Sequence, residues 1–303
     1  MAPATIGFVG LGAMGLPMAV RLIEAGYQVR GFDVSDAALS RLIEVGGTAC
    51  TSPVATAKGA SAVITMLPNS AAVQSVVLEG AEPLVDGLAG ALLIDMSSSA
   101  PTSTQMTGKL LGQRGLAMID APVSGGVPRA TTGMLTIMAG GEAQHIARVE
   151  PILATLGNVI FAVGSLGSGH AMKALNNYMS AAGLTAACEA IRIGQRFGLD
   201  PSQMVDILNV STGRNNSTEN KIKPLVLSGS YAGGFSLGLM AKDLAVAAEL
   251  ADTMGMASPL THAIAELWSQ AQDALSGNAD HTEIDRFLSS LQQNNFGIGK
   301  EGR

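Results

Sequence analysis

Short apolar runs alternate with amphipathic segments along the first half of the chain. The apolar runs predict strands at 5–9, 28–32, 62–67, 91–96, 116–120, 135–139 and 159–163. The segments between most of them predict helices, of which the first covers 14–24 and ends before Gly26. Strands that are apolar along nearly their whole length indicate a mostly parallel sheet covered by helices on both faces.

This alternation stops near Gly164. Residues 168–197 are rich in Ala, Leu and Met, contain no proline, and predict a long, largely buried helix that ends near Gly198. Further helices are predicted at 201–211, 217–227, 238–254, 258–275 and 280–292, with no strand among them, and a polar tail at 294–303. We therefore expect two domains, an α/β domain over residues 1–164 and an all-helical domain over residues 165–303.

The composition excludes several classes of partner. Hydrophobic residues make up 47% of the 303 residues and charged residues 14%, so a folded chain is expected. The formal net charge is −6 and no cluster of Lys and Arg occurs, which argues against binding to nucleic acid. No apolar stretch is long enough to cross a membrane, so a membrane is not expected as a partner.

The two cysteines and four histidines add little chemistry. Cys50 and Cys188 stand far apart, which is typical of a protein in a reducing cytosol and predicts a cytoplasmic location. The histidines show no spacing typical of metal ligands, so no metal site is expected, and we interpret them as surface or capping residues. They are His145, His170, His262 and His281.

A glycine-rich segment follows the first predicted strand and opens the first predicted helix. It reads Gly10, Leu11, Gly12, Ala13, Met14 and Gly15, which is a G-x-G-x-x-G pattern. Gly10 permits a tight turn, Gly12 lets a pyrophosphate approach the backbone, and Gly15 lets the helix pack closely on the strand. The free N–H groups at the helix N-terminus favour phosphate, so this segment predicts a dinucleotide site.

Asp33 ends the second predicted strand and bears on the choice of cofactor. A carboxylate at this position can accept both hydrogen bonds from an adenosine ribose diol, and it repels a 2′-phosphate. Residues 34–36 contain no Arg or Lys that would offset this repulsion. We predict that NAD is preferred over NADP. The alternative is that Asp33 only caps the helix that begins at Asp36.

Four segments together resemble the β-hydroxyacid dehydrogenase family, of the 3-hydroxyisobutyrate dehydrogenase type. The segments lie at 7–18, 120–126, 167–177 and 235–244, in the order that the family shows, and together they span most of the chain. The resemblance implies a Rossmann-type N-terminal domain and an all-α C-terminal domain, as in a short form of the 6-phosphogluconate dehydrogenase fold. It also implies a homo-oligomer, either a dimer or a tetramer.

Lys173 is the expected catalytic acid/base. Oxidation of an alcohol by hydride transfer needs a base for the hydroxyl proton, and Lys173 lies in the first turns of a helix that carries few charges. Burial and a helix N-terminus both lower the pKa of a lysine toward the working pH. Asn177 follows one turn later on the same face, where its amide can hold the substrate beside Lys173.

The remaining expected substrate contacts come from two segments. Ser124, Gly125 and Gly126 can form a carboxylate cradle, in which the hydroxyl and the backbone N–H groups donate hydrogen bonds; the alternative is a simple turn. The resemblance implies that Lys242 approaches both the substrate and the nicotinamide. Asp243 beside it is open to interpretation as an acid in the first turn of a helix, and Phe235 either covers the cofactor or belongs to the core.

Further cofactor contacts are expected where two strands end. Leu67, Pro68 and Asn69 follow one predicted strand, and Ser97 follows the next. Ligands of open α/β sheets bind outside the carboxyl ends of the strands, so these residues are placed to contact the cofactor. The resemblance implies the same role for them.

The substrate is predicted to be a short 3-hydroxy acid of the 3-hydroxyisobutyrate kind. Residues 214–218 form a polar loop that departs from the versions typical of the family, so glyoxylate, succinic semialdehyde or tartronate semialdehyde reduction remains an alternative. A rival from another class is a non-catalytic dinucleotide sensor that has kept the fold. Such a sensor has little need for Lys173, Asn177 and the Ser124 segment together.

Overall fold

The computed structural model describes the backbone of residues 4–296 and the side chains of residues 4–291. The chain forms two compact units, Met1–Lys173 and Ala174–Arg303. The division lies inside the long helix α8 (Ser168–Phe197), so the first turns of this helix belong to the first unit. The expected limit between residues 164 and 165 lies in the short connection before this helix.

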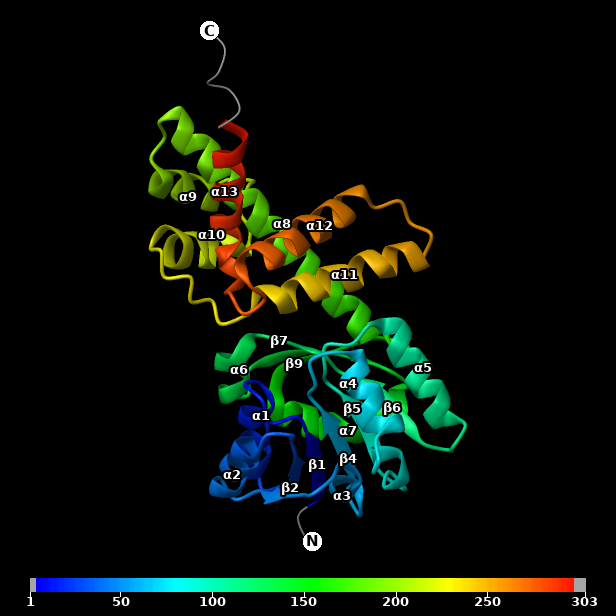
Figure 1. Ribbon diagram of the computed structural model, residues 1–303. Coiled ribbons are helices and arrows are strands. Elements are labelled where there is room, and N and C mark those ends of the chain that lie inside the picture. The colour runs from blue at the N-terminus through cyan, green and yellow to red at the C-terminus, as the bar shows by residue number, and fades with distance from the viewer. Residues whose placement is uncertain (1–3, 297–303) are drawn as a thin grey trace. The chain divides into compact units, whose positions relative to one another are not determined.

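The first unit is built on a nine-stranded sheet with the order β3-β2-β1-β4-β5-β6-β8-β7, and β9 pairs with β8 (Figure 1). The strands are β1 (Thr5–Val9), β2 (Gln28–Phe32), β3 (Thr48–Ala49), β4 (Ala62–Thr65), β5 (Leu92–Asp95), β6 (Ala117–Asp120), β7 (Val123–Ser124), β8 (Leu135–Gly140) and β9 (Gly157–Gly164). Strand β8 is antiparallel to β6 and β7, and all other pairings are parallel. The mostly parallel sheet predicted from the apolar runs is therefore confirmed.

Helices cover both faces of this sheet because its central strands are apolar on both sides. Ile64, Ile94 and Ile119 point into the core beneath α1 (Gly15–Glu24), α2 (Asp36–Glu44) and α7 (Ala143–Leu156). The adjacent residues of the same strands, Val63, Leu93 and Met118, point into the opposite core. The second core is closed by α3 (Pro53–Ala57), α4 (Ser70–Gln74), η1 (Ser75–Glu79), η2 (Leu84–Asp86) and α5 (Pro101–Gly112). A short helix, α6 (Gly126–Thr132), follows β7.

The carboxyl ends of the central strands lie in one row. Val9 is in register with Thr65, Thr65 with Asp95, and Asp95 with Asp120. The chain therefore leaves β1, β4, β5 and β6 at the same edge of the sheet, where ligands of open α/β sheets bind. This edge is the part of the fold that matters for the site.

The second unit is helical in the part that the structure describes. Besides the rest of α8, its helices are α9 (Pro201–Asn209), α10 (Asn216–Asn220), η3 (Ile222–Leu227), α11 (Leu237–Thr253), α12 (Pro259–Leu275), η4 (His281–Glu283) and α13 (Ile284–Phe296). Its core surrounds the fully buried Trp268, whose indole N–H donates to the Thr185 hydroxyl at 3.0 Å. Apart from an isolated bridge between Ser236 and Asp280, no strand pairing occurs among its described residues.

The predicted polar tail is wrong at its beginning. Residues 294–296 continue α13, because no Gly or Pro interrupts the helix before residue 297. Residues 297–303 lie outside the described part of the chain. None of the helices over residues 4–296 is both long and apolar enough to cross a membrane.

Candidate dinucleotide and proton-transfer site

The three glycines of the loop after β1 meet different surroundings. Gly10 has φ +96°, and a side chain there would collide with the backbone carbonyl of Met66. A side chain at Gly15 would collide with the carbonyl of Gly10. At Gly12, by contrast, nothing lies within 4 Å of the position that a Cβ atom would occupy. Gly10 and Gly15 therefore permit close backbone packing, whereas Gly12 leaves open space beside the loop.

Helix α1 begins at this loop with its N-terminus accessible to an anion. Its first turn contains no acidic residue, and the Met14 side chain does not cap it. The Leu16 N–H donates to the carbonyl of Gly12 at 3.1 Å, so the loop runs directly into the helix. The uncapped N–H groups and the helix dipole both favour negative charge here. Leu11, Ala13 and Met14 form the remaining backbone of the loop.

Asp33 joins this loop to the end of β2. Its Oδ2 accepts a hydrogen bond from the Leu11 N–H at 2.7 Å, and its Oδ1 accepts one from the Ser35 N–H at 2.8 Å. The side chain that caps α2 is Ser35, whose hydroxyl accepts from the Ala38 N–H. The alternative interpretation of Asp33 as the cap of this helix is therefore wrong. Asp33 is half-buried, and a carboxylate has more acceptor positions than these two bonds use.

The loops after β4 and β5 are joined by hydrogen bonds. The Leu67 N–H donates to the Ser97 hydroxyl at 2.9 Å, and the Ser98 N–H donates to the Leu67 carbonyl. The Asn69 side chain caps α4 by accepting from the Ala72 N–H at 2.9 Å. Ser97 is only 2% exposed, so its hydroxyl joins the two loops by a hydrogen bond that lies beneath this edge of the sheet. Leu67 and Pro68 lie on the more accessible side.

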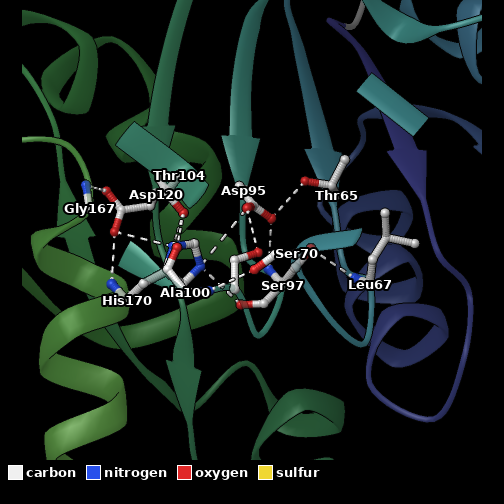
Figure 2. Close-up of polar contacts among 11 residues, drawn as sticks. Thr65, Leu67, Ser70, Asp95, Ser97, Ala100, Thr104, Asp120, Gly167 and His170 are labelled. Atoms are coloured by element: carbon white, nitrogen blue, oxygen red, sulfur yellow. Dashed lines mark hydrogen bonds and ion pairs between the residues drawn. The ribbon is translucent and has the colours of Figure 1, made fainter. Parts of the chain in front are cut away.

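Two buried aspartates end the neighbouring strands β5 and β6 (Figure 2). Asp95 accepts hydrogen bonds from the Thr65 hydroxyl, the Ser97 N–H and the Ser99 hydroxyl. These bonds tie the ends of β4 and β5 and the loop that follows into one arrangement.

Asp120 is bound differently, because its partners are backbone groups at the start of α8. Its Oδ1 accepts from the Gly167 N–H at 2.7 Å, and its Oδ2 accepts from the His170 N–H at 2.8 Å. Burial raises the pKa of Asp120, although the His170 ring and the two N–H donors act in the opposite direction. The carboxylate therefore caps the N-terminus of the helix that carries Lys173.

His170 lies between these two aspartates, with an exposure of 1%. Its Nε2 lies 3.0 Å from the Ser97 carbonyl and its Nδ1 lies 2.8 Å from the Thr104 hydroxyl. Figure 2 shows the ring between the two strand ends. A carbonyl oxygen only accepts, so Nε2 carries a proton. The ring nitrogens lie 3.5 Å from Asp120 and 4.0 Å from Asp95. The interpretation of His170 as a surface or capping residue is therefore wrong.

His281 also departs from that interpretation, since it is 4% exposed and its ring packs against Phe235, which borders the helical core. The sequence did contain one signal for the buried network in the first unit. Two apolar strands end in aspartate, at Asp95 and Asp120, although aspartate rarely occurs buried without partners. Which group would join them was not visible in the sequence, because His170 is 50 residues away from Asp120 along the chain.

The segment Ser124–Gly126 connects a strand to a helix. Val123 and Ser124 form β7, which pairs with β8, and Gly125 precedes α6. Gly125 has φ +135° and Gly126 has φ +66°, conformations that favour glycine at both positions. The segment thus leads from a strand into a helix, and Ser124 is half-buried in that strand.

Helix α8 carries Lys173 and Asn177 one turn apart on one face. Lys173 is half-buried, and Asn177 is 5% exposed. The Asn177 amide donates to Asp243 Oδ2, and Asp243 Oδ1 lies 3.1 Å from the Lys242 amine. Asp243 lies in the second turn of α11 and is 4% exposed, so its interpretation as a first-turn acid is wrong. Asn177, Asp243 and Lys242 form one polar group in the helical unit.

Phe235 belongs to the surroundings of the helical core. Its ring packs edge-on against His281, with 5.9 Å between the ring centroids. Its carbonyl accepts hydrogen bonds from the His281 N–H and ring. Over the described residues, no three His, Cys, Asp or Glu side chains are arranged to hold a metal ion.

The parallel sheet, the open glycine loop and the acid after β2 define an α/β protein of the dinucleotide-binding class. Two family sequence models match the chain. One is described as the NAD binding domain of 6-phosphogluconate dehydrogenase and matches residues 5–164. The other is described as NAD-binding of NADP-dependent 3-hydroxyisobutyrate dehydrogenase and matches residues 167–288.

Similar proteins agree with these matches over nearly the full length of the chain. A 2-(hydroxymethyl)glutarate dehydrogenase of Eubacterium barkeri is 34% identical over 92% of this chain and 93% of its own length. A 3-hydroxyisobutyrate dehydrogenase of Pseudomonas aeruginosa is 36% identical over 95% of this chain and 97% of its own. The solved structure of a Mycobacterium tuberculosis 3-hydroxyisobutyrate dehydrogenase with L-serine is 31% identical, with a TM-score of 0.86, covering 94% of this chain and 99% of that one. The chain belongs to the NAD(P)-dependent β-hydroxyacid dehydrogenase family.

Proposed function

We propose that this chain transfers a hydride between NAD and a short 3-hydroxy acid of the 3-hydroxyisobutyrate kind, with Lys173 as the general acid/base. One observation carries the proposal. Lys173 lies one turn after His170 on a helix whose N-terminus is bound by Asp120 at the carboxyl edge of the sheet. This places a lysine in the same compact unit as the glycine loop and Asp33.

The residues of the first unit fit a dinucleotide. The open space at Gly12 and the uncapped N-terminus of α1 suit the pyrophosphate, and the unused acceptor positions of Asp33 suit the adenosine ribose. Leu67, Pro68 and Asn69 would border it at the end of β4. When bound, the nicotinamide supplies the hydride acceptor for oxidation or the hydride donor for reduction.

Lys173 would handle the proton of the reaction. In the oxidising direction its neutral amine takes the hydroxyl proton as the substrate carbon–oxygen bond becomes a carbonyl. In the reducing direction its ammonium returns that proton. Asn177 and Lys242 would orient the substrate from the helical side. The Ser124 hydroxyl and the N–H groups of Gly125 and Gly126 would bind the substrate carboxylate.

The preference for NAD is supported by Asp33. Its carboxylate would lie against a 2′-phosphate, and the three residues that follow supply no cation. One matching family model is named for an NADP-dependent enzyme. Measuring the activity of this protein with NAD and with NADP therefore tests the proposed preference for NAD directly. The acid at Asp33 favours NAD.

The test is a screen of short 2-hydroxy and 3-hydroxy acids with NAD and with NADP, together with glyoxylate and short semialdehydes in the reducing direction. We expect turnover with a 3-hydroxy acid and NAD. Lys173→Ala should lower kcat by about 10²–10⁴-fold while NADH still binds. The matched control is Lys109→Ala, at an exposed lysine of α5. Silence of the wild-type protein on the whole panel would favour the dinucleotide sensor instead.

A further inference from the structure

The face of α8 that carries Lys173 and Asn177 continues to a third polar residue. Ser180 follows Lys173 by seven residues, or two helical turns, and therefore lies on the same face about 10 Å farther along the helix. Asn177 is bound to Asp243, as described above. Ser180 has a different partner, the amine of Lys221.

Lys221 is a half-buried cation that pairs with no carboxylate among the residues that the structure describes. Its Nζ donates to the Ser180 hydroxyl at 3.1 Å, and no acidic group among the described residues lies within ion-pair distance of it. Lys223, two residues later, illustrates the usual arrangement, with its amine 2.6 Å from Asp206. An ammonium has three N–H donors, so the Ser180 hydroxyl leaves donor capacity on this half-buried amine for an acceptor.

The acid that acts most strongly on Lys221 is already bound elsewhere. Burial lowers the pKa of Lys221, and Asp280 raises it by a smaller amount. Asp280 accepts hydrogen bonds from the Gly234 N–H and from the Thr282 N–H and hydroxyl. Asp280 therefore does not neutralise the ammonium by direct contact.

The polar segment 214–218, which was expected to be a loop and whose last three residues begin α10, lies beside α8 at Gly183. Asn215 caps α10, and its side chain lies 3.5 Å from the position that a Cβ atom on Gly183 would occupy. Ser217, one turn before Lys221, is 1% exposed, and its hydroxyl has no hydrogen-bond partner among the described residues. Asn215 and Ser217 therefore bring further polar groups to the segment that leads into Lys221.

We propose that Lys221 and Ser180 form an anion-binding subsite that receives a second acidic group at the distal end of the substrate. An oxyanion there would accept hydrogen bonds from the Lys221 ammonium and the Ser180 hydroxyl. The substrate class is then a short hydroxy acid with two acidic groups. The identification of the anion as part of the substrate rests on the proposed function, in which Lys173 acts at the other end of this helix face.

Two probes that do not react test the subsite directly. Glutarate carries two carboxylates and butyrate carries one, and the binding of each is measured by calorimetry with NADH present. We expect glutarate to bind about 10-fold or more tightly than butyrate, and Lys221→Met to remove the difference. Ser180→Ala should reduce it by about 3-fold. Lys223→Met is the matched control, because that lysine belongs to the same segment and is paired with Asp206.

Kinetics with two substrates provide a second readout. The two substrates are 3-hydroxyisobutyrate and a homologue that is extended by an arm ending in a carboxylate. In Lys221→Met the ratio of kcat/KM for the extended acid to that for the shorter acid should fall by about 10-fold. The subsite is overturned if the two probes bind equally to the wild type, or if Lys221→Met weakens both to the same extent.

The two proposals fail in different ways. If no hydroxy acid is turned over but glutarate binding depends on Lys221, the subsite stands and the proposed reaction is wrong. If 3-hydroxyisobutyrate is turned over and glutarate shows no preference that depends on Lys221, the reaction stands and the subsite is wrong. Thermal melting of each variant verifies that it is folded.

Discussion

The carboxylate of Asp120 accepts a hydrogen bond of 2.8 Å from the backbone N–H of His170, which joins the end of β6 to the start of α8. The same carboxylate accepts a second hydrogen bond from the Gly167 N–H. Lys173 follows His170 by one turn, so the position of the proposed proton donor depends on an acid at the edge of the sheet. Asp120 and the His170 ring thus help to hold the first turn of α8 against the sheet within the first unit.

Replacing Asp120 with Asn should weaken this attachment. An amide presents one oxygen to two N–H donors, so one backbone N–H loses its buried acceptor. We expect the free energy of unfolding to fall by about 1–3 kcal/mol in urea titrations, and kcat to fall with it. Asp86→Asn, at an exposed acid in η2, is the control and should change stability by less than about 0.5 kcal/mol. Equal stability of Asp120→Asn and the wild type would contradict the capping role.

The pH dependence of Asp120 has a definite sign. Burial raises the pKa of Asp120 in the folded protein above the ordinary value of 3.8. At a pH between 3.8 and this raised pKa, the folded protein therefore holds a proton that the unfolded chain has released. The stability contributed by this carboxyl is therefore largest below 3.8 and decreases as pH rises through the folded pKa. We expect the difference in unfolding free energy between the wild type and Asp120→Asn to be smaller at about pH 7 than at about pH 4. A difference that grows with pH would show that the pKa is lowered instead.

Removal of the His170 ring should destabilise the first unit. His170→Ala removes the ring donor of the Ser97 carbonyl, leaves Thr104 with only the Ala100 carbonyl as its hydrogen-bond partner, and opens a cavity between two aspartates. A loss of about 2–4 kcal/mol is expected from denaturant unfolding. His262→Ala serves as the comparison, because that histidine is exposed and pairs with Asp252. If the two variants lost the same small amount, the buried network would contribute little to stability.

The cofactor preference is expected to depend on Asp33. In Asp33→Ser, affinity for NADH should fall by about 10-fold and affinity for NADPH should rise, because the repulsion toward a 2′-phosphate is removed. The change is measured by titrating the fluorescence of each reduced cofactor. Asp36→Ser is the control, at the exposed first residue of α2. Tighter binding of NADPH than of NADH by the wild type would refute the preference.

Most of the fold could be predicted from local patterns. All seven predicted strands are present, with ends shifted by two residues or fewer, and the long helix at 168–197 is present over the same residues. Apolar runs and helical periodicity are properties of neighbouring residues, so they are visible in the sequence. The strands β3 and β7 were not predicted, because each has only two residues and its pairing depends on a distant strand.

In the candidate site, too, the local features could be predicted from the sequence, whereas the long-range contacts could not. Gly10, Gly12 and Gly15 could be assigned different environments from their order in the chain, since a tight turn before a helix is a local structure. Asp33 was expected at a strand end, but its bond to the Leu11 N–H joins residues 22 positions apart. The surroundings of His170 and the partner of Asn177 were not predictable, because each requires two elements from distant parts of the chain to pack together.

The sequence by itself determined the order of strands and helices, the glycine loop and the family. These depend on residue type and short-range spacing, which can be recognised without knowledge of any long-range contact. Only the tertiary structure decided that His170 is buried between Asp95 and Asp120, and that the Lys221 amine donates to the Ser180 hydroxyl. The physical reason is that burial and electrostatic pairing depend on which distant groups are brought together when water is excluded from the core.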